Sequence, residues 1–118
     1  DCSEIEECDL YCFRQAEEKI REKIRPYGIH GIHFLDSGNY HYVTAIMTSQ
    51  IQKEFQLVVF DHHTDMQKPM IEHMTSCGDW AGKVLATNQW LQQLVLIGPQ
   101  ESDIEQIYRE NDGLMNRK

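Results

Sequence analysis

The sequence has no long hydrophobic run and a shortage of positive charge. Its longest apolar stretches, Leu57–Phe60 and Leu94–Ile97, are far shorter than the roughly 20 residues of a membrane-spanning helix, so we expect no membrane partner. Eleven Lys and Arg against nineteen Asp and Glu give a formal net charge of −8. Because nucleic acids and anionic lipids bind positive surfaces, this balance argues against nucleic acid as a partner.

Cysteine is present but lacks the spacing of a structural zinc site. No Cys-x-x-Cys pair occurs among Cys2, Cys8, Cys12 and Cys77. Residues 1–7 are acidic, whereas a secretory leader is basic and then apolar. Since disulfides belong mainly to oxidising compartments, we expect reduced thiols and a cytoplasmic location.

The length of 118 residues and the hydrophobic content of 41% predict one globular α/β domain over residues 1–118. Ser76 and Asp79, like Ser102 and Glu105, have the spacing of a helix capping box. Periodicity predicts helices at 13–24, 40–52, 80–87 and 103–110, strands at 29–35, 55–60 and 94–97, and a frayed tail at 111–118. This alternation is typical of a parallel sheet built from βαβ units.

The strand at 55–60 carries the most informative pattern. Its unbroken β-branched and aromatic residues predict a strand buried on both faces. In parallel sheets ligands bind at the carboxyl ends of the strands, and the polar loops at 35–41 and 61–75 leave that edge. We therefore expect the functional side chains in these two loops.

Polar residues at alternate positions follow this strand. An extended backbone would aim Asp61, His63 and Asp65 toward one side. Carboxylate oxygens with imidazole nitrogen favour manganese, zinc or iron. His41, at the start of the helix after the preceding strand, is expected to lie close to Asp61.

These segments resemble the arginase, agmatinase and histone-deacetylase superfamily, and within it the arginase-like branch that includes peptide arginases. The string Asp-His-His-Thr-Asp at 61–65 resembles the superfamily's Asp-x-His-x-Asp signature. Gly-Asn-Tyr-His at 38–41 is similar to its upstream Gly-Gly-Asp-His, with the two middle residues changed. The likeness covers about residues 31–99.

The resemblance implies a three-layer α/β/α fold that holds two manganese ions. Their bridging hydroxide would hydrolyse a guanidino group to urea and an amine, and the substrate would be a small guanidino compound or an arginine in a peptide. By this likeness His41 binds one metal and Asp61 bridges both. His63 and Asp65 complete the ligand positions, and Asp61 and Asp65 are the catalytic carboxylates.

The likeness to the superfamily is incomplete. The superfamily supplies two further aspartates from a later Asp-x-Asp pair, which this sequence lacks. The chain therefore resembles an N-terminal half, and we expect it to bind metal weakly and to turn over little or nothing alone. Ser76 and Asp79 fall where the superfamily has a substrate-contacting loop, although their capping-box spacing explains them equally well.

Two other functions stay open. Asp61-His62-His63 also resembles the motif of Asp-His-His phosphoesterases, but those enzymes need an upstream His with closely spaced aspartates, and only Asp36 and His41 are available here. A non-catalytic α/β module that forms a homo-oligomer is the third candidate, because an uncovered sheet edge invites pairing. Trp80 and Trp90 are expected in the core.

Overall fold

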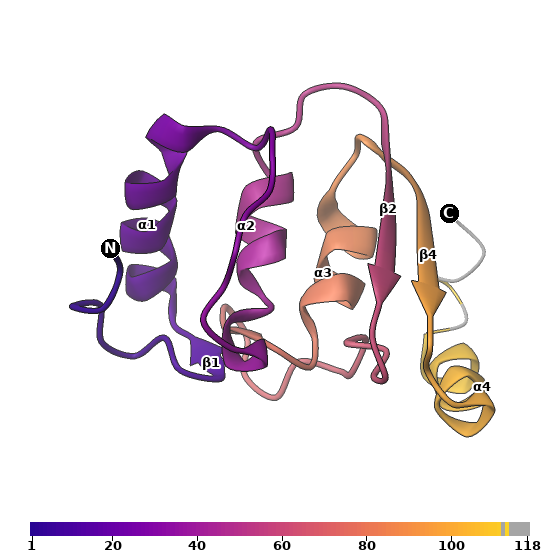
Figure 1. The fold of residues 1–118 in the computed structure, drawn as a ribbon. Helices are drawn as coiled ribbons and strands as arrows, with labels where there is room; N and C mark the ends of the chain where they lie inside the picture. The colour runs from indigo at the N-terminus through magenta and orange to yellow at the C-terminus, as the bar shows by residue number, and fades with distance from the viewer. Residues whose placement is uncertain (112, 114–118) are drawn as a thin grey trace.

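A computed structural model describes residues 1–111 and residue 113. Strands β2 and β4 form a parallel sheet, and β1 and β3 form a short antiparallel one. Helices α1, α2 and α3 stand side by side next to β2, and α4 lies beyond the end of β4 (Figure 1). The elements are β1 (Tyr11–Cys12), α1 (Arg14–Ile24), η1 (Arg25–Tyr27), η2 (Gly38–Tyr40), α2 (Val43–Thr48), β2 (Phe55–Phe60), β3 (Thr75–Ser76), α3 (Trp80–Thr87), β4 (Leu91–Ile97) and α4 (Glu101–Glu110).

The β2–α3–β4 segment confirms the predicted βαβ unit. β2 has the predicted bounds, and β4 begins three residues before the predicted start at Leu94. Leu57 lies opposite Leu94 and Phe60 opposite Ile97, so the two strands end at the same edge. The chain is thus a mixed α/β protein with a parallel strand pair.

The strand predicted at 29–35 is wrong. The chain there is irregular, and the side chains of Ile32 and Phe34 are 84% and 92% exposed. Gly31 has a φ of +104°, which interrupts an extended run. Within the described residues β2 pairs only with β4, so residues 29–35 lack the hydrogen-bonding neighbour that a strand requires.

The prediction that β2 is buried on both faces is also wrong. Val59 is buried and Leu57 is half-buried in the core cluster. Val58 and Phe60 point to the opposite face, where Phe60 is 77% exposed. The helices α1, α2 and α3 lie on one side of the strands (Figure 1), so the described residues leave the other face of the sheet largely bare.

Helix bounds agree with the sequence to different degrees. α1 and α3 match their predicted ranges closely, whereas α2 is only six residues long and follows the 3-10 turn η2. α4 begins at Glu101 with Gln100 as its N-cap, so the prediction of a start at the Ser102 capping box is wrong. Most of the tail expected to fray, residues 112 and 114–118, lies outside the described residues.

The buried apolar side chains form one cluster between the helices and the sheet. Trp80, Tyr42, Leu91 and Cys12 are its largest fully buried members, which confirms the core position predicted for Trp80. Trp90 lies at the surface instead, so its predicted core position is wrong. All four cysteines are free thiols. Among the described residues, no helix is long and apolar enough to cross a membrane.

Candidate metal centre

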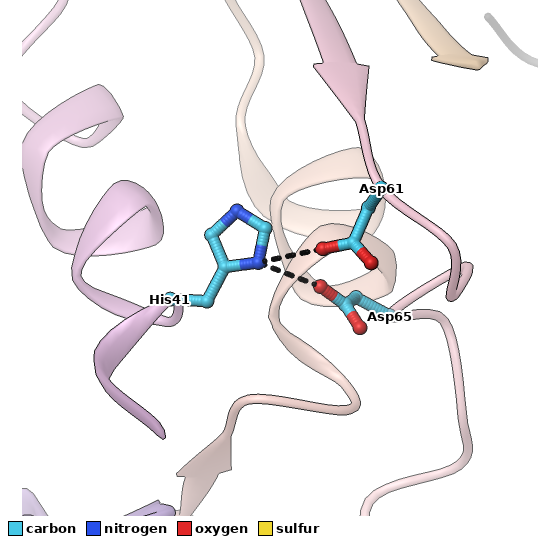
Figure 2. Close-up of side chains that lie close together, drawn as sticks. All are labelled: His41, Asp61 and Asp65. Carbon is cyan, nitrogen blue, oxygen red and sulfur yellow. Dashed lines mark ion pairs between the residues drawn. The ribbon is translucent and has the colours of Figure 1, made fainter. Parts of the chain in front are cut away.

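Three side chains meet at the carboxyl end of β2. His41 Nδ1 lies 3.1 Å from Asp61 Oδ2 and 3.1 Å from Asp65 Oδ2 (Figure 2). One ligand atom from each residue lies within 4.8 Å of the other two. The sequence-based expectation that His41 lies near Asp61 is therefore confirmed. We call these three residues the first ligand group.

His41 is positioned by the turn before it and the anchor after it. Its backbone N–H donates to the Gly38 carbonyl and closes η2, while the Ser37 hydroxyl accepts the Asn39 N–H at the start of that turn. Tyr42 is fully buried, and its hydroxyl donates to the Cys8 carbonyl over 2.6 Å. This buried anchor fixes the backbone from which the imidazole reaches the carboxylates.

Asp61 continues the ladder of the parallel sheet. Its N–H donates to the Ile97 carbonyl over 3.0 Å, and its Oδ1 accepts the His63 N–H over 2.9 Å in a tight turn. Gly98 packs against the carbonyl of Asp61: a Cβ at Gly98 would lie 2.5 Å from that oxygen, and its φ is +115°. Only glycine fits this close contact without displacing Asp61.

Asp65 is the most constrained member of the first ligand group. Its φ of +50° is in the left-handed region, and its carbonyl accepts the N–H groups of Ala81 and Gly82 in the first turn of α3. The indole N–H of Trp80 donates to Asp65 Oδ2 over 2.6 Å. The residue is buried, so this network holds a carboxylate that water barely reaches.

The imidazole of His41 also packs against the ring of Trp80, with centroids 4.7 Å apart. The hydrogen bond to Asp65 raises the pKa of His41, and the charges of Asp65 and Asp61 add to that shift, against the opposing effect of burial. The site therefore stabilises positive charge between its two carboxylates. A divalent cation at this place would meet the same two carboxylates.

His63 is not a member of the first ligand group. Its side chain is 77% exposed, and its Nδ1 lies 3.5 Å from Asp61 Oδ1, the oxygen that faces away from His41. The two oxygens of Asp61 therefore each lie near a different imidazole. We call Asp61 Oδ1 with His63 the second ligand group.

The predicted substrate residues Ser76 and Asp79 lie at the start of α3, and both are buried. Asp79 Oδ1 accepts the Ser76 N–H over 2.8 Å, which is half of the predicted capping box, and Ser76 Oγ accepts the Gly78 N–H. The helix itself begins at Trp80. These contacts give both residues a local structural role, and their substrate role stays a prediction.

The first ligand group fits a divalent cation. Neighbouring ligands of an octahedral ion, each about 2.1 Å from it, lie about 3 Å apart. The 3.1 Å separations from His41 to each carboxylate match that spacing. One nitrogen with two oxygens suits manganese, iron or zinc.

Sequence reasoning did not assign Trp80 and Gly98 to the site. Trp80 was expected only as a core residue, and its ring holds two of the three ligands. Gly98 directly follows the strand predicted at 94–97, and it packs on the backbone of Asp61. The one sequence feature that indicates a role for Gly98 at the site is its position directly after a strand that ends beside a ligand. No sequence feature indicates such a role for Trp80.

Comparison with known proteins gives little further information. The chain is 35% identical over 79 residues to an uncharacterized protein of Thermotoga maritima. The match covers 67% of this chain and 30% of that protein, so the chain spans less than a third of the relative's length. No family model matches the sequence. No solved structure matches it either.

Proposed function

We propose that this chain carries part of the metal centre of an arginase-like, manganese-dependent hydrolase that converts a guanidino group to urea and an amine. The observation that carries the proposal is the meeting of His41, Asp61 and Asp65 at the end of a parallel strand. The Asp-x-His-x-Asp spacing at 61–65 supports it, because the same spacing marks the superfamily that the sequence resembles.

The two carboxylate oxygens of Asp61 have different neighbours, which supports a site for two ions. Oδ2 faces His41 and Asp65, and Oδ1 faces His63. The first ligand group would hold one ion, and Asp61 with His63 would offer ligands to a second. Bound divalent ions would lower the pKa of a water molecule and so supply a nucleophile at neutral pH.

The residues of this chain would hold and orient the ligands. The Trp80 indole N–H fixes one oxygen of Asp65, as groups behind metal ligands commonly do. The α3 amides hold the Asp65 backbone, and Gly98 lets the Asp61 backbone lie close to β4. The remaining ligands would come from outside the present sequence.

The bare face of the sheet supports a larger fold of the proposed kind. Val58, Phe60 and Ile97 share this face, since Phe60 and Ile97 are register partners, and all three are exposed. Parallel sheets usually have both faces covered. A third layer that completes an α/β/α fold would bury these side chains, and the greater length of the Thermotoga relative leaves room for one.

The proposal is tested by assaying the manganese-loaded chain for urea release from agmatine, arginine and an arginine-containing peptide. Electron paramagnetic resonance of the bound ion reports whether each guanidine reaches it. We expect at most slow urea release, and a guanidine-dependent change in the spectrum that Asp61→Asn abolishes. Bound manganese that responds to no guanidine, without any urea, would contradict the proposal.

The same proteins test the phosphoesterase alternative with bis(p-nitrophenyl) phosphate. If the chain cleaves this diester and Asp61→Asn abolishes the cleavage, a phosphoesterase would replace the guanidino hydrolase as the proposed function.

The bare sheet face also favours a self-associating module as a second candidate. Sedimentation of the wild type against Phe60→Ser tests it, because only pairing through this face would be lost in the variant.

A further inference from the structure

The members of the first ligand group come from two separate parts of the chain. His41 follows the turn η2, whereas Asp61 and Asp65 belong to the stretch between β2 and α3. A third part, residues 8–12, contacts the chain next to both of them and contains β1. It lies at the end of the molecule where β2 ends and α3 begins (Figure 1). We call residues 8–12 the N-terminal segment.

The N-terminal segment holds the chain on both sides of His41. The Tyr42 hydroxyl donates to the Cys8 carbonyl over 2.6 Å, and the Asn39 side-chain amide donates to Asp9 Oδ1 over 3.0 Å. Tyr42 is fully buried, and a buried hydrogen bond is costly to lose. The backbone before and after His41 is therefore tied to one short stretch of chain.

The same segment holds the chain that leads into α3. β1 pairs with β3 in the antiparallel sheet, and the Cys77 N–H donates to the Leu10 carbonyl over 3.0 Å. At the start of α3 the indole N–H of Trp80 donates to Asp65 Oδ2, and the Asp65 carbonyl accepts backbone amides of the helix. The N-terminal segment is thus connected by a few hydrogen bonds to the carboxylate side of the first ligand group as well.

The backbone of the N-terminal segment has an unfavourable conformation. Leu10 has a φ of +60°, and so does Glu7 just before the segment. Residues other than glycine adopt this left-handed conformation at a cost, and it persists where surrounding contacts impose it. The path of the segment is therefore set by the two parts of the chain that it joins rather than by its own local preference.

We infer that the N-terminal segment positions the first ligand group, with Tyr42 and Asp9 as positioning residues. The inference rests on the proposed function, because it concerns binding of the metal ion. Ligands of one octahedral ion must lie about 3 Å apart, and here they reach that spacing from separate loops. Tyr42 and Asp9 would act through His41 and would not touch the ion. Groups that hold metal ligands in this way commonly change metal affinity by about 10- to 100-fold.

The decisive variant is Tyr42→Phe, which keeps the ring in the core and loses the hydroxyl. We expect manganese affinity to fall by about tenfold in calorimetry of the folded variant. Pulsed electron paramagnetic resonance detects coupling between bound manganese and an imidazole nitrogen, and His41→Ala identifies the coupling due to His41. At saturating manganese this coupling should weaken in Tyr42→Phe. A loss of stability alone would leave the coupling unaltered, because each bound ion would keep its imidazole.

The control for lost stability is Thr48→Val. Thr48 is also buried, and its hydroxyl donates to the Thr44 carbonyl over 2.8 Å at the end of α2 opposite η2. This variant therefore removes a buried hydroxyl without touching the N-terminal segment. It should bind manganese as the wild type does, with the His41 coupling intact.

Asp9 provides a second test at the surface, where a substitution does not disturb the core. Asp9→Ala removes both the charge and the acceptor for the Asn39 amide, whereas Asp9→Asn removes the charge and keeps an acceptor oxygen. We expect Asp9→Ala to lower manganese affinity by about threefold, which is the lower end of the effect of one hydrogen bond. Asp9→Asn should bind manganese as the wild type does.

Each outcome has a distinct meaning. Absence of manganese binding in the wild type would contradict the proposed function and this inference with it. Normal binding in the wild type, with unchanged affinity in either Tyr42→Phe or Asp9→Ala, would overturn the inference and leave the metal centre intact. An equal loss of affinity in Tyr42→Phe and Thr48→Val would overturn it as well. If Tyr42→Phe does not fold, the comparison of Asp9→Ala with Asp9→Asn decides in the same way.

Discussion

The first and second ligand groups share Asp61 but differ in how firmly this chain holds them. In the first, Asp65 is buried, accepts the Trp80 indole N–H and caps α3 with its carbonyl. In the second, His63 is mostly exposed and contacts Asp61 alone at the site. His63 and Asp65 are only two residues apart. Burial and hydrogen bonding, more than sequence spacing, therefore determine that the Asp65 side chain is held in place while the His63 side chain is exposed.

The largest expected effect is that of Asp61→Asn, because Asp61 belongs to both groups. We expect manganese affinity to fall by more than about 100-fold, beyond the range typical of residues that only support a ligand. Calorimetric titration measures it, with the exposed Asp36→Asn as the charge-matched control. Unchanged affinity in Asp61→Asn would show that the ion binds elsewhere.

Trp80→Phe tests the support behind the first ligand group. The variant keeps an aromatic ring in the core but loses the N–H that donates to Asp65. We expect manganese affinity to fall by about 10- to 100-fold. The surface variant Trp90→Phe should bind manganese as the wild type does. Equal affinity in the two variants would mean that Trp80 contributes only to packing.

Gly98→Ala tests the contact that places Asp61. The new Cβ would press on the Asp61 carbonyl and force an unfavourable φ. We expect the free energy of unfolding to fall by about 1–3 kcal/mol and manganese affinity to fall less than in Trp80→Phe. Gly38→Ala is the control, because a Cβ there meets no other atom. Chemical denaturation that finds the two variants equally stable would contradict this placement.

The smallest effect is expected for His63→Ala. Since the His63 side chain is 77% exposed and lies near Asp61 alone at the site, manganese affinity should change by less than about threefold, as for most surface substitutions. His41→Ala should lose most of the affinity. A large loss in His63→Ala would show that both groups bind metal in this chain, and would remove the contrast between them.

Much of the architecture could be predicted from sequence because local patterns specify it. The β-branched run at 55–60 became β2, and the spacing of charged and apolar residues defined α1. The parallel pairing of β2 with β4 followed from the helix between them. The proximity of His41 to Asp61 was predicted from a strand at 29–35 that does not form, and the turn η2 with the buried Tyr42 brings His41 there instead.

Other features depend on contacts that the sequence does not display. Alternate spacing assumes a straight backbone, whereas the chain turns at Asp61 and takes a positive φ at Asp65, so His63 points away from the first ligand group. Residues 29–35 have strand-like composition but no hydrogen-bonding neighbour among the described residues. The apolar run of β2 predicts burial on both faces, and only one face is covered by the helices.

The most direct test of the metal centre is a manganese titration followed by electron paramagnetic resonance, comparing the wild type with His41→Ala. The free ion gives a strong signal that decreases when the ion binds, so the titration yields both stoichiometry and affinity. We predict one bound ion in the wild type and its loss in His41→Ala. No bound ion in the wild type, or full affinity in His41→Ala, would contradict the account.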